Sequence, residues 1–300
     1  MKIGVQLPIT GSSGTPEDMR ALIQKVEALG FASVWLGDHI VLPADNSESS
    51  YPYMDRFGPE ISNDLFPEKN FLEAMTTAAF IAGVTSSINV GIGVLILPMR
   101  NALQSAKEYA TIDYLSGGRL ILGVGAGWFR EEFESLGVEF KDRGPKLDES
   151  IEVMKVLWSG NPSSFNGRFY DFEGVTCLPA PSKVEIWIGG HTERALLRCA
   201  RLGTGWHAIE LSPSEFSATS TRLSELLDIE GRKASDVTRS LATRLSLSTE
   251  DSTELKEILD AYQSAGCEHL IVYASPKRNI SENLERYVRL AGYLEELGMG

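Results

Sequence analysis

Cysteine and histidine are scarce in this chain. Cys177, Cys199 and Cys267 are odd in number and widely spaced, and no Cys-x-x-Cys pair occurs. This usage argues against a disulfide framework and predicts reduced thiols in a cytoplasmic protein. The four histidines occur in neither the His-x-His nor the His-Glu-x-x-His spacing, so the usual patterns of a catalytic zinc are missing and we expect no metal site. The Gly-x-Ser-x-Gly turn of serine hydrolases is also absent.

Positive charge and long apolar runs are scarce as well. The chain has 28 Lys and Arg against 41 Asp and Glu, a net charge of −13 at pH 7. This balance argues against nucleic acid or an anionic membrane surface as a partner. No apolar run reaches membrane-spanning length, and Met1-Lys2 leads directly into strand-like sequence. We therefore expect neither a transmembrane segment nor a signal peptide.

Apolar, strand-like segments alternate with amphipathic, helical segments along the chain. We expect strands over residues 2–8, 32–36, 88–97, 184–188, 206–209, 243–247 and 269–274, and one more that begins at Leu120. We expect helices over residues 16–29, 68–83, 102–115, 145–158, 192–202, 213–227, 254–265 and 281–297. About eight strand–helix units in strict alternation predict parallel strands, and they favour one α/β domain over residues 1–300, a closed (β/α)8 TIM barrel.

Two stretches interrupt the alternation. Residues 43–67 contain prolines and aromatic residues without periodicity, and we interpret them as an ordered lid loop after the second strand. Residues 160–183 contain Asn166-Gly167 between aromatic residues, which suggests an inserted hairpin.

Residues 120–129 combine a buried strand with a Gly-x-Gly-x-Gly turn. Phe129, Phe133 and Leu136 then repeat at helical spacing and predict a short helix. The glycines differ in spacing from the dinucleotide-binding fingerprint. Two interpretations stay open: the glycines let the backbone approach a ligand closely, or they permit close packing of a helix on a strand.

Ligands bind at the carboxyl ends of the strands in such barrels. One predicted strand ends in Asp38-His39. His39 is either a core histidine or, between Asp38 and the lid loop, a group that transfers protons.

Another predicted strand ends in Gly189-Gly190-His191 and opens a helix near Thr192. Backbone N–H groups at such a helix start can hold a phosphate, with charge added by arginines on the helix; the alternative is a plain helix start with solvated arginines. Trp128 and Trp206 also lie at strand ends and are candidates for lining a pocket.

Several segments together have a familiar order and spacing. They are residues 34–39 (VWLGDH), 91–101 (GIGVLILPMRN), 118–127 (GRLILGVGAG), 143–149 (RGPKLDE) and 186–190 (IWIGG). With these segments the chain resembles the bacterial luciferase-like superfamily of flavin and deazaflavin enzymes over nearly its whole length. The resemblance implies a (β/α)8 barrel with an insertion after the fourth helix, and FMN or coenzyme F420 bound at the carboxyl face.

The resemblance is greatest to the F420-dependent branch, in which Asp-His ends the second strand. It implies that His39 lies over the reactive carbon of the deazaflavin, that Gly93–Val94 is a non-proline cis peptide behind the ring, and that Gly189-Gly190 binds the phosphate. One position departs from the branch. Its sugar-phosphate dehydrogenases carry a glutamate just after the glycine turn, where this chain has Trp128. The difference suggests a more apolar substrate that stacks rather than pairs by charge.

We therefore predict an oxidoreductase that transfers a hydride between F420 and a small organic molecule, with His39 as the catalytic proton donor or acceptor. The expected cofactor-binding residues are Asp38, Gly93, Val94, Leu95, Gly127, Trp128, Gly189, Gly190, His191 and Trp206. We expect a homodimer. Two alternatives stay open: an FMN-dependent luciferase-like monooxygenase that uses oxygen, and a flavin-binding relative without catalysis.

Overall fold

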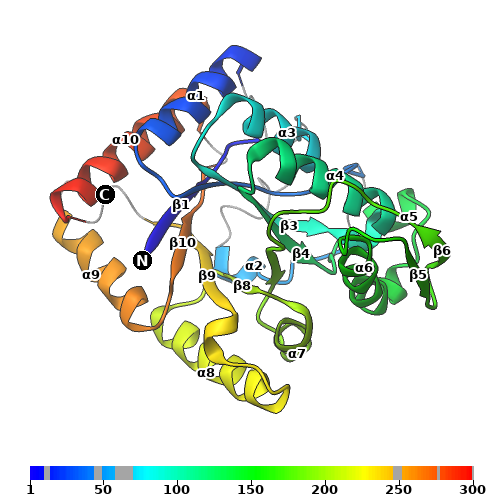
Figure 1. Ribbon diagram of the computed structural model, residues 1–300. Helices are drawn as coiled ribbons and strands as arrows, with labels where there is room; N and C mark the ends of the chain where they lie inside the picture. Colours follow the sequence, from blue (N-terminus) through cyan, green and yellow to red (C-terminus); the bar gives the residue numbers. More distant parts are fainter. Residues whose placement is uncertain (10–13, 44–48, 58–69, 246–251, 276–277, 299–300) are drawn as a thin grey trace.

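Eight parallel strands close into a barrel in this computed structural model, which describes residues 1–9, 14–43, 49–57, 70–245, 252–275 and 278–298 (Figure 1). The strands are β1 (Lys2–Gln6), β2 (Ser33–Leu36), β3 (Asn89–Ile96), β4 (Leu120–Gly125), β7 (Ile186–Gly189), β8 (Gly205–Ile209), β9 (Thr238–Thr243) and β10 (His269–Val272). Around the barrel they run β1-β10-β9-β8-β7-β4-β3-β2. The predicted (β/α)8 barrel is confirmed.

Helices surround the barrel, and α10, near the C-terminus, packs beside α1 (Figure 1). The long helices are α1 (Pro16–Ala28), α3 (Ala74–Val84), α4 (Ala102–Ser116), α6 (Arg143–Leu157), α7 (Glu193–Leu202), α8 (Pro213–Ile229), α9 (Ser252–Ser264) and α10 (Ile280–Glu296). Shorter ones are α2 (Met54–Phe57), α5 (Arg130–Ser135) and the 3-10 turns η1 (Leu97–Met99), η2 (Phe140–Asp142) and η3 (Ala234–Asp236). Among the helices described, none is long and apolar enough to cross a membrane.

Local sequence explains where α1 begins. Thr15 accepts a hydrogen bond from the backbone N–H of Asp18, and the Asp18 carboxylate accepts one from the N–H of Thr15. This reciprocal pair satisfies two N–H groups that a helix start otherwise leaves without partners. Pro16 fits the first position because its missing N–H costs nothing there.

The expected insertion is a hairpin after α6, the helix that follows the fourth barrel strand. Its antiparallel strands are β5 (Ser163–Asn166) and β6 (Asp171–Val175), at the edge of the molecule beside α6 (Figure 1). The carboxylate of Glu149 on α6 accepts hydrogen bonds from three backbone N–H groups of the turn, those of Arg168, Phe169 and Tyr170. The hairpin is thereby attached to the barrel.

One predicted strand was wrong. We expected it over residues 243–247, but β9 spans Thr238–Thr243. The first residues of β9 include polar side chains, so the sequence there lacks the apolar pattern of a buried strand. These side chains are hydrogen-bonded: the Arg239 guanidinium donates to Ser220 Oγ at 2.6 Å, and Ser240 Oγ donates to the carbonyl of Trp206 at 2.9 Å. Buried polar groups that are fully hydrogen-bonded fit a core, yet they remove the apolar signal from the sequence.

Aromatic and imidazole rings fill the barrel interior. The rings of Trp35 and His207 stack with centroids 4.8 Å apart, and Trp187 meets His269 edge-on at 5.5 Å. Burial lowers the pKa of His207 to about 4 and that of His269 to about 3, so both are neutral at pH 7. A Cβ on Gly93 would lie 2.7 Å from His207 Nε2, so this packed floor lies directly behind β3.

The expected lid loop is described only in part. Residues 44–48 and 58–67 lie outside the described ranges, whereas residues 49–57 are described and include α2. This described part carries Tyr51 and Tyr53, which line a cavity at the carboxyl face of the barrel.

Candidate active site

A cavity of about 640 Å³ opens at the carboxyl ends of the barrel strands. Its walls come from the carboxyl ends of all eight strands and the segments that follow them, as expected for a (β/α)8 barrel. The lining residues that the sequence predicted are Asp38, His39, Gly93, Val94, Gly127, Trp128, Gly189 and Gly190.

His39 is held by a buried carboxylate. Its Nδ1 lies 2.7 Å from Glu132 Oε2, and the Glu132 side chain is only 1% exposed. Glu132 Oε1 accepts hydrogen bonds from the backbone N–H groups of Ile40 at 2.6 Å and Val41 at 3.2 Å. Glu132 on α5 thus ties the segment after β2 to the segment after β4 and fixes the His39 ring at the cavity wall.

The sequence interpretation missed Glu132 and named only Asp38 as an acidic residue next to His39. A signal existed, because Glu132 lies three residues after Phe129 and four before Leu136, on the buried face of the short helix. An acid within an apolar helical stripe indicates a buried carboxylate that needs a partner.

Asp38 instead pairs with Arg100. Asp38 Oδ1 lies 2.6 Å from Arg100 Nη2, and Oδ2 accepts a hydrogen bond from the backbone N–H of Ile96 at 2.8 Å. Burial raises the pKa of Asp38, while the Arg100 guanidinium and the Ile96 N–H oppose that rise. Glu73 Oε1 lies 3.0 Å from the same guanidinium nitrogen. This cluster fixes the end of β3 against the end of β2.

The Gly93–Val94 segment also lines the cavity, and its peptide bond is cis, as predicted. Val94 sits in a space made by glycines of β4 and β7, the next two strands of the barrel. A Cβ on Gly125 would lie 2.6 Å from Val94 Cγ2, and one on Gly189 would lie 2.6 Å from Val94 Cγ1. These two glycines therefore give room to the side chain of Val94. For Gly125, this role differs from both interpretations of the glycine-rich strand, namely close approach to a ligand and close packing of a helix.

Gly127 is explained differently, by its backbone. Its φ is +83°, and a Cβ would meet Ile96 Cγ2 at 2.6 Å and the Phe133 ring at 2.7 Å. A residue with a side chain would be strained and crowded at this turn. The glycine lets the chain pass along the cavity wall into α5.

The Gly189-Gly190 turn carries the chain from β7 to the start of α7. Gly190 has a φ of +97°, and its N–H donates to the carbonyl of His207 at 3.0 Å. That N–H is therefore committed within the fold, so the amino end of α7 remains as the backbone group suited to an anion. Thr192 caps this end, accepting from the N–H of Ala195, and both residues line the cavity.

Cationic side chains gather at this end of the cavity although the chain is strongly acidic. Lys141, Arg143, Arg194 and Arg198 all line it. Burial and the positive charges of Arg130 and Arg194 lower the pKa of Arg143, whose guanidinium donates to the carbonyls of Gly127 and Phe140. Arg198 is paired with Asp148. Adjacent arginines of like charge make an environment that favours an anion.

Aromatic rings line another part of the cavity, around His39. Trp128 lies edge-on to Tyr51 with centroids 5.2 Å apart and stacks on Phe129 at 5.1 Å. Phe71 meets the His39 ring edge-on at 5.2 Å. The catalytic candidate therefore faces an apolar, aromatic chamber, while the cationic end lies near α7.

Three predicted site residues do not line the cavity. Leu95 is fully buried in the hydrophobic core. Trp206 is also fully buried; its Nε1–H donates to the carbonyl of Gly190 at 2.8 Å, so it supports the turn from behind. The ring of His191 packs on Tyr53, with centroids 4.7 Å apart.

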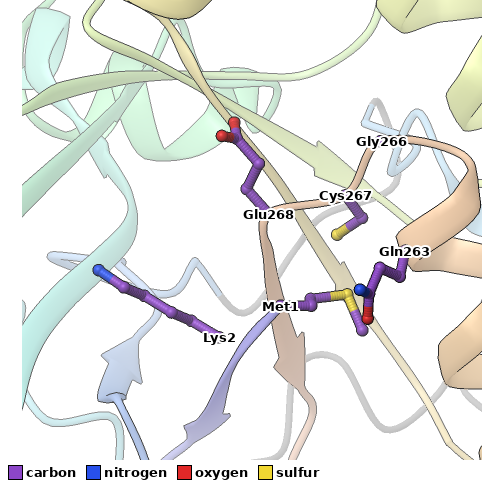
Figure 2. Close-up of a pocket in the computed structure, with 6 residues that line it drawn as sticks. All are labelled: Met1, Lys2, Gln263, Gly266, Cys267 and Glu268. Atoms are coloured by element: carbon purple, nitrogen blue, oxygen red, sulfur yellow. The ribbon is translucent and has the colours of Figure 1, made fainter.

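A second hollow lies near the amino ends of β1 and β10 (Figure 2). It is lined by Met1, Lys2, Gln263, Gly266, Cys267 and Glu268, and the side chains of Lys2 and Glu268 extend away from the Met1 and Gln263 side chains. Its position is opposite to the face at which such barrels bind ligands. The carboxyl-face cavity is thus the candidate active site.

The fold is a closed (β/α)8 barrel, and a histidine, a glycine turn and a group of cationic side chains line the cavity at its carboxyl face. These features define the class: a (β/α)8-barrel protein with a candidate ligand site at the carboxyl ends of its strands. The luciferase-like monooxygenase family model matches residues 1–298. The chain belongs to this family.

Individual relatives are consistent with that membership. An uncharacterized protein of Mycobacterium tuberculosis is 34% identical over 212 residues, which is 70% of this chain and 72% of the relative. The FMNH2-dependent dimethylsulfone monooxygenase of Pseudomonas fluorescens is 32% identical over 139 residues, 45% of this chain and 38% of that protein. A solved F420-dependent secondary alcohol dehydrogenase in complex with an F420-acetone adduct shares the fold, with a TM-score of 0.77, 15% identity and 98% of each chain covered.

Proposed function

We propose that this protein is an oxidoreductase that uses coenzyme F420 and acts on a small organic substrate at the carboxyl face of the barrel. Family membership and the relatives named above support an oxidoreductase with a flavin or deazaflavin cofactor. The observation that carries the F420 assignment is the His39 ring, which Glu132 fixes at the wall of the cavity that Gly93 and Val94 also line.

The residues present fit such a cofactor. Gly93, Val94 and Gly127 form a wall without bulky side chains for a flat ring, and the amino end of α7 with Arg143 and Arg194 suits its anionic tail. Bound F420 supplies a two-electron centre that accepts or donates a hydride. Asp38 and Arg100 keep the wall in place through their ion pair.

His39 moves the proton that accompanies the hydride. In an alcohol, the C–H bond gives up the hydride and the O–H bond gives up a proton, which the imidazole of His39 accepts; in the reverse direction His39 returns it. The aromatic residues Tyr51, Phe71 and Trp128 around His39 favour a substrate with an apolar or aromatic body.

A cofactor titration tests this assignment. F420 and FMN are titrated separately against the protein, followed by the visible absorbance of the deazaflavin and by flavin fluorescence. F420 is expected to bind more tightly than FMN. FMN binding that is equal or tighter, together with oxygen-dependent turnover of reduced FMN, would contradict the assignment.

That outcome would favour the second candidate, an FMN-dependent monooxygenase. Its support is the 32% identity to the Pseudomonas fluorescens FMNH2-dependent enzyme. The two functions share the barrel and the anion site, so they differ in the cofactor that is bound and in whether oxygen is consumed.

Replacement of His39 tests its role. His39→Ala is expected to lower F420-dependent turnover by roughly 10²–10⁴-fold, which is the usual contribution of a general acid–base group. The F420 affinity should stay within a few-fold, because the residues proposed to hold the ring and the anionic tail do not include His39. Full turnover in His39→Ala would show that another group moves the proton.

A further inference from the structure

The hydrogen bonds around Glu132 restrict where the protons of His39 can be. Glu132 Oε1 lies 2.6 Å from the backbone nitrogen of Ile40 and 3.2 Å from that of Val41. Backbone N–H groups can only donate, so Oε1 is an acceptor twice. Glu132 Oε2 lies 2.7 Å from His39 Nδ1, and in its ionised form the Glu132 side chain accepts at both oxygens.

A carboxylate that only accepts requires a donor at Nδ1. A neutral imidazole carries one N–H and one acceptor nitrogen, so a proton on Nδ1 makes Nε2 the acceptor. Three aromatic rings hold this orientation, because Phe71, Trp128 and Phe129 all meet the His39 ring edge-on, with centroids 5.2, 6.4 and 6.0 Å away. A rotation that exchanged the two ring nitrogens would have to displace them.

We propose that Glu132 is the positioning residue of the active site, which holds neutral His39 in the tautomer with its proton on Nδ1. The inference rests on the proposed function for what this tautomer does. In the oxidation of an alcohol, the substrate O–H bond breaks, its proton passes to His39 Nε2, and the hydride leaves the carbon for F420. The imidazolium that results stays paired with the Glu132 carboxylate, which balances its new charge.

The tautomer can be measured without cofactor or substrate. The protein is labelled with ¹⁵N-histidine, and ring-nitrogen chemical shifts distinguish protonated from unprotonated positions; a spectrum of His39→Ala assigns the His39 signals. We expect Nδ1 protonated and Nε2 unprotonated in neutral His39. In Glu132→Gln the side-chain amide can donate to Nδ1, so the Nε2–H tautomer should become populated. An Nε2–H tautomer in the parent protein, or no change in Glu132→Gln, would overturn the proposal.

Kinetics provide the second measurement. Glu132→Gln should lower kcat by roughly 10²–10⁴-fold with little change in F420 affinity, since a carboxylate-to-amide change beside a catalytic histidine has an effect of this order. Glu132→Asp, which keeps the charge, should recover part of the loss. The matched control is Glu134→Gln, the same change on the same helix at a side chain that is 61% exposed; it should leave kcat and the tautomer unchanged.

The outcomes separate this inference from the proposed function. Absence of F420 turnover in the parent protein would refute the proposed function, while the ¹⁵N spectra would still decide the role of Glu132. If Glu132→Gln did not fold, as judged by its circular dichroism, Glu132→Asp and the parent spectrum would decide it. Equal kcat in folded Glu132→Gln and the parent would refute the positioning role.

Discussion

Gly189→Ala is the sharpest structural perturbation of the cavity wall. Gly189 ends β7, and the added Cβ would lie 2.6 Å from Cγ1 and 3.2 Å from Cγ2 of Val94. Unstrained carbon atoms meet at about 3.5–4.0 Å, so the new methyl group overlaps Val94 by roughly 1 Å. Valine cannot rotate easily out of the way, because it is branched at Cβ and stiff at χ1.

The expected cost follows from this overlap. Extra methyl groups in a packed core destabilise a protein by about 1–3 kcal/mol, and we expect a loss in that range. Val94 also lines the cavity, so its displacement should reach the cofactor site. A tenfold weaker F420 affinity, about 1.4 kcal/mol, is the expected scale.

Urea unfolding gives the stability change, and an F420 titration gives the affinity change. Gly292→Ala on α10 is the control, because a Cβ there meets nothing within 4 Å; it should stabilise the helix by about 0.5–1 kcal/mol. Val94→Ala added to Gly189→Ala should recover stability, with a coupling of about 0.5–3 kcal/mol. Unchanged stability and affinity in Gly189→Ala would refute the packing role of Val94.

Three further outcomes are expected. Gly190→Asp should remove most of the F420 affinity in a calorimetric titration, since it adds a carboxylate two residues before the α7 cap Thr192 and strains a turn whose φ is +97°, with a Cβ 3.0 Å from Tyr53 Oη; parent-like affinity would argue against an anion at the amino end of α7. Arg194→Ala should weaken F420 binding about 3–10-fold at low salt and less at high salt, and an effect that does not depend on salt would argue against a charge role. The free energy of unfolding should fall as the pH drops from 6.5 to about 4, because burial lowers the pKa of His207 to about 4 and the unfolded chain takes up the proton first. His207→Gln should make that part of the urea-derived pH profile flatter, and an identical profile would show that other groups are responsible.

The order of the fold could be predicted because its signals are local. Apolar periodicity and caps such as Thr15 with Asp18 depend on residues within a few positions of one another. The strand at Thr238–Thr243 was misplaced for the opposite reason. Arg239 and Ser240 are buried only because α8 and β8 supply hydrogen-bond partners from elsewhere in the chain.

Part of the candidate site could also be predicted from sequence, and part could not. A parallel barrel brings the carboxyl ends of its strands to one face, so Asp38-His39, Gly93-Val94 and Gly189-Gly190 could be placed together from sequence. Leu95 and Trp206 do not line the cavity, because position near a strand end does not say which way a side chain points. Both are buried behind the wall.

The sequence by itself determined the barrel, its insertion and the segments that meet at the cavity, since periodicity, turns and strand ends act over short distances. Only the tertiary structure decided the pairings that give those segments their chemistry. Glu132 is 93 residues from His39, and Arg100 is 62 residues from Asp38. Which carboxylate reaches which partner depends on how the strand-end segments lie across the barrel mouth, and that geometry follows from the closed sheet rather than from any local pattern.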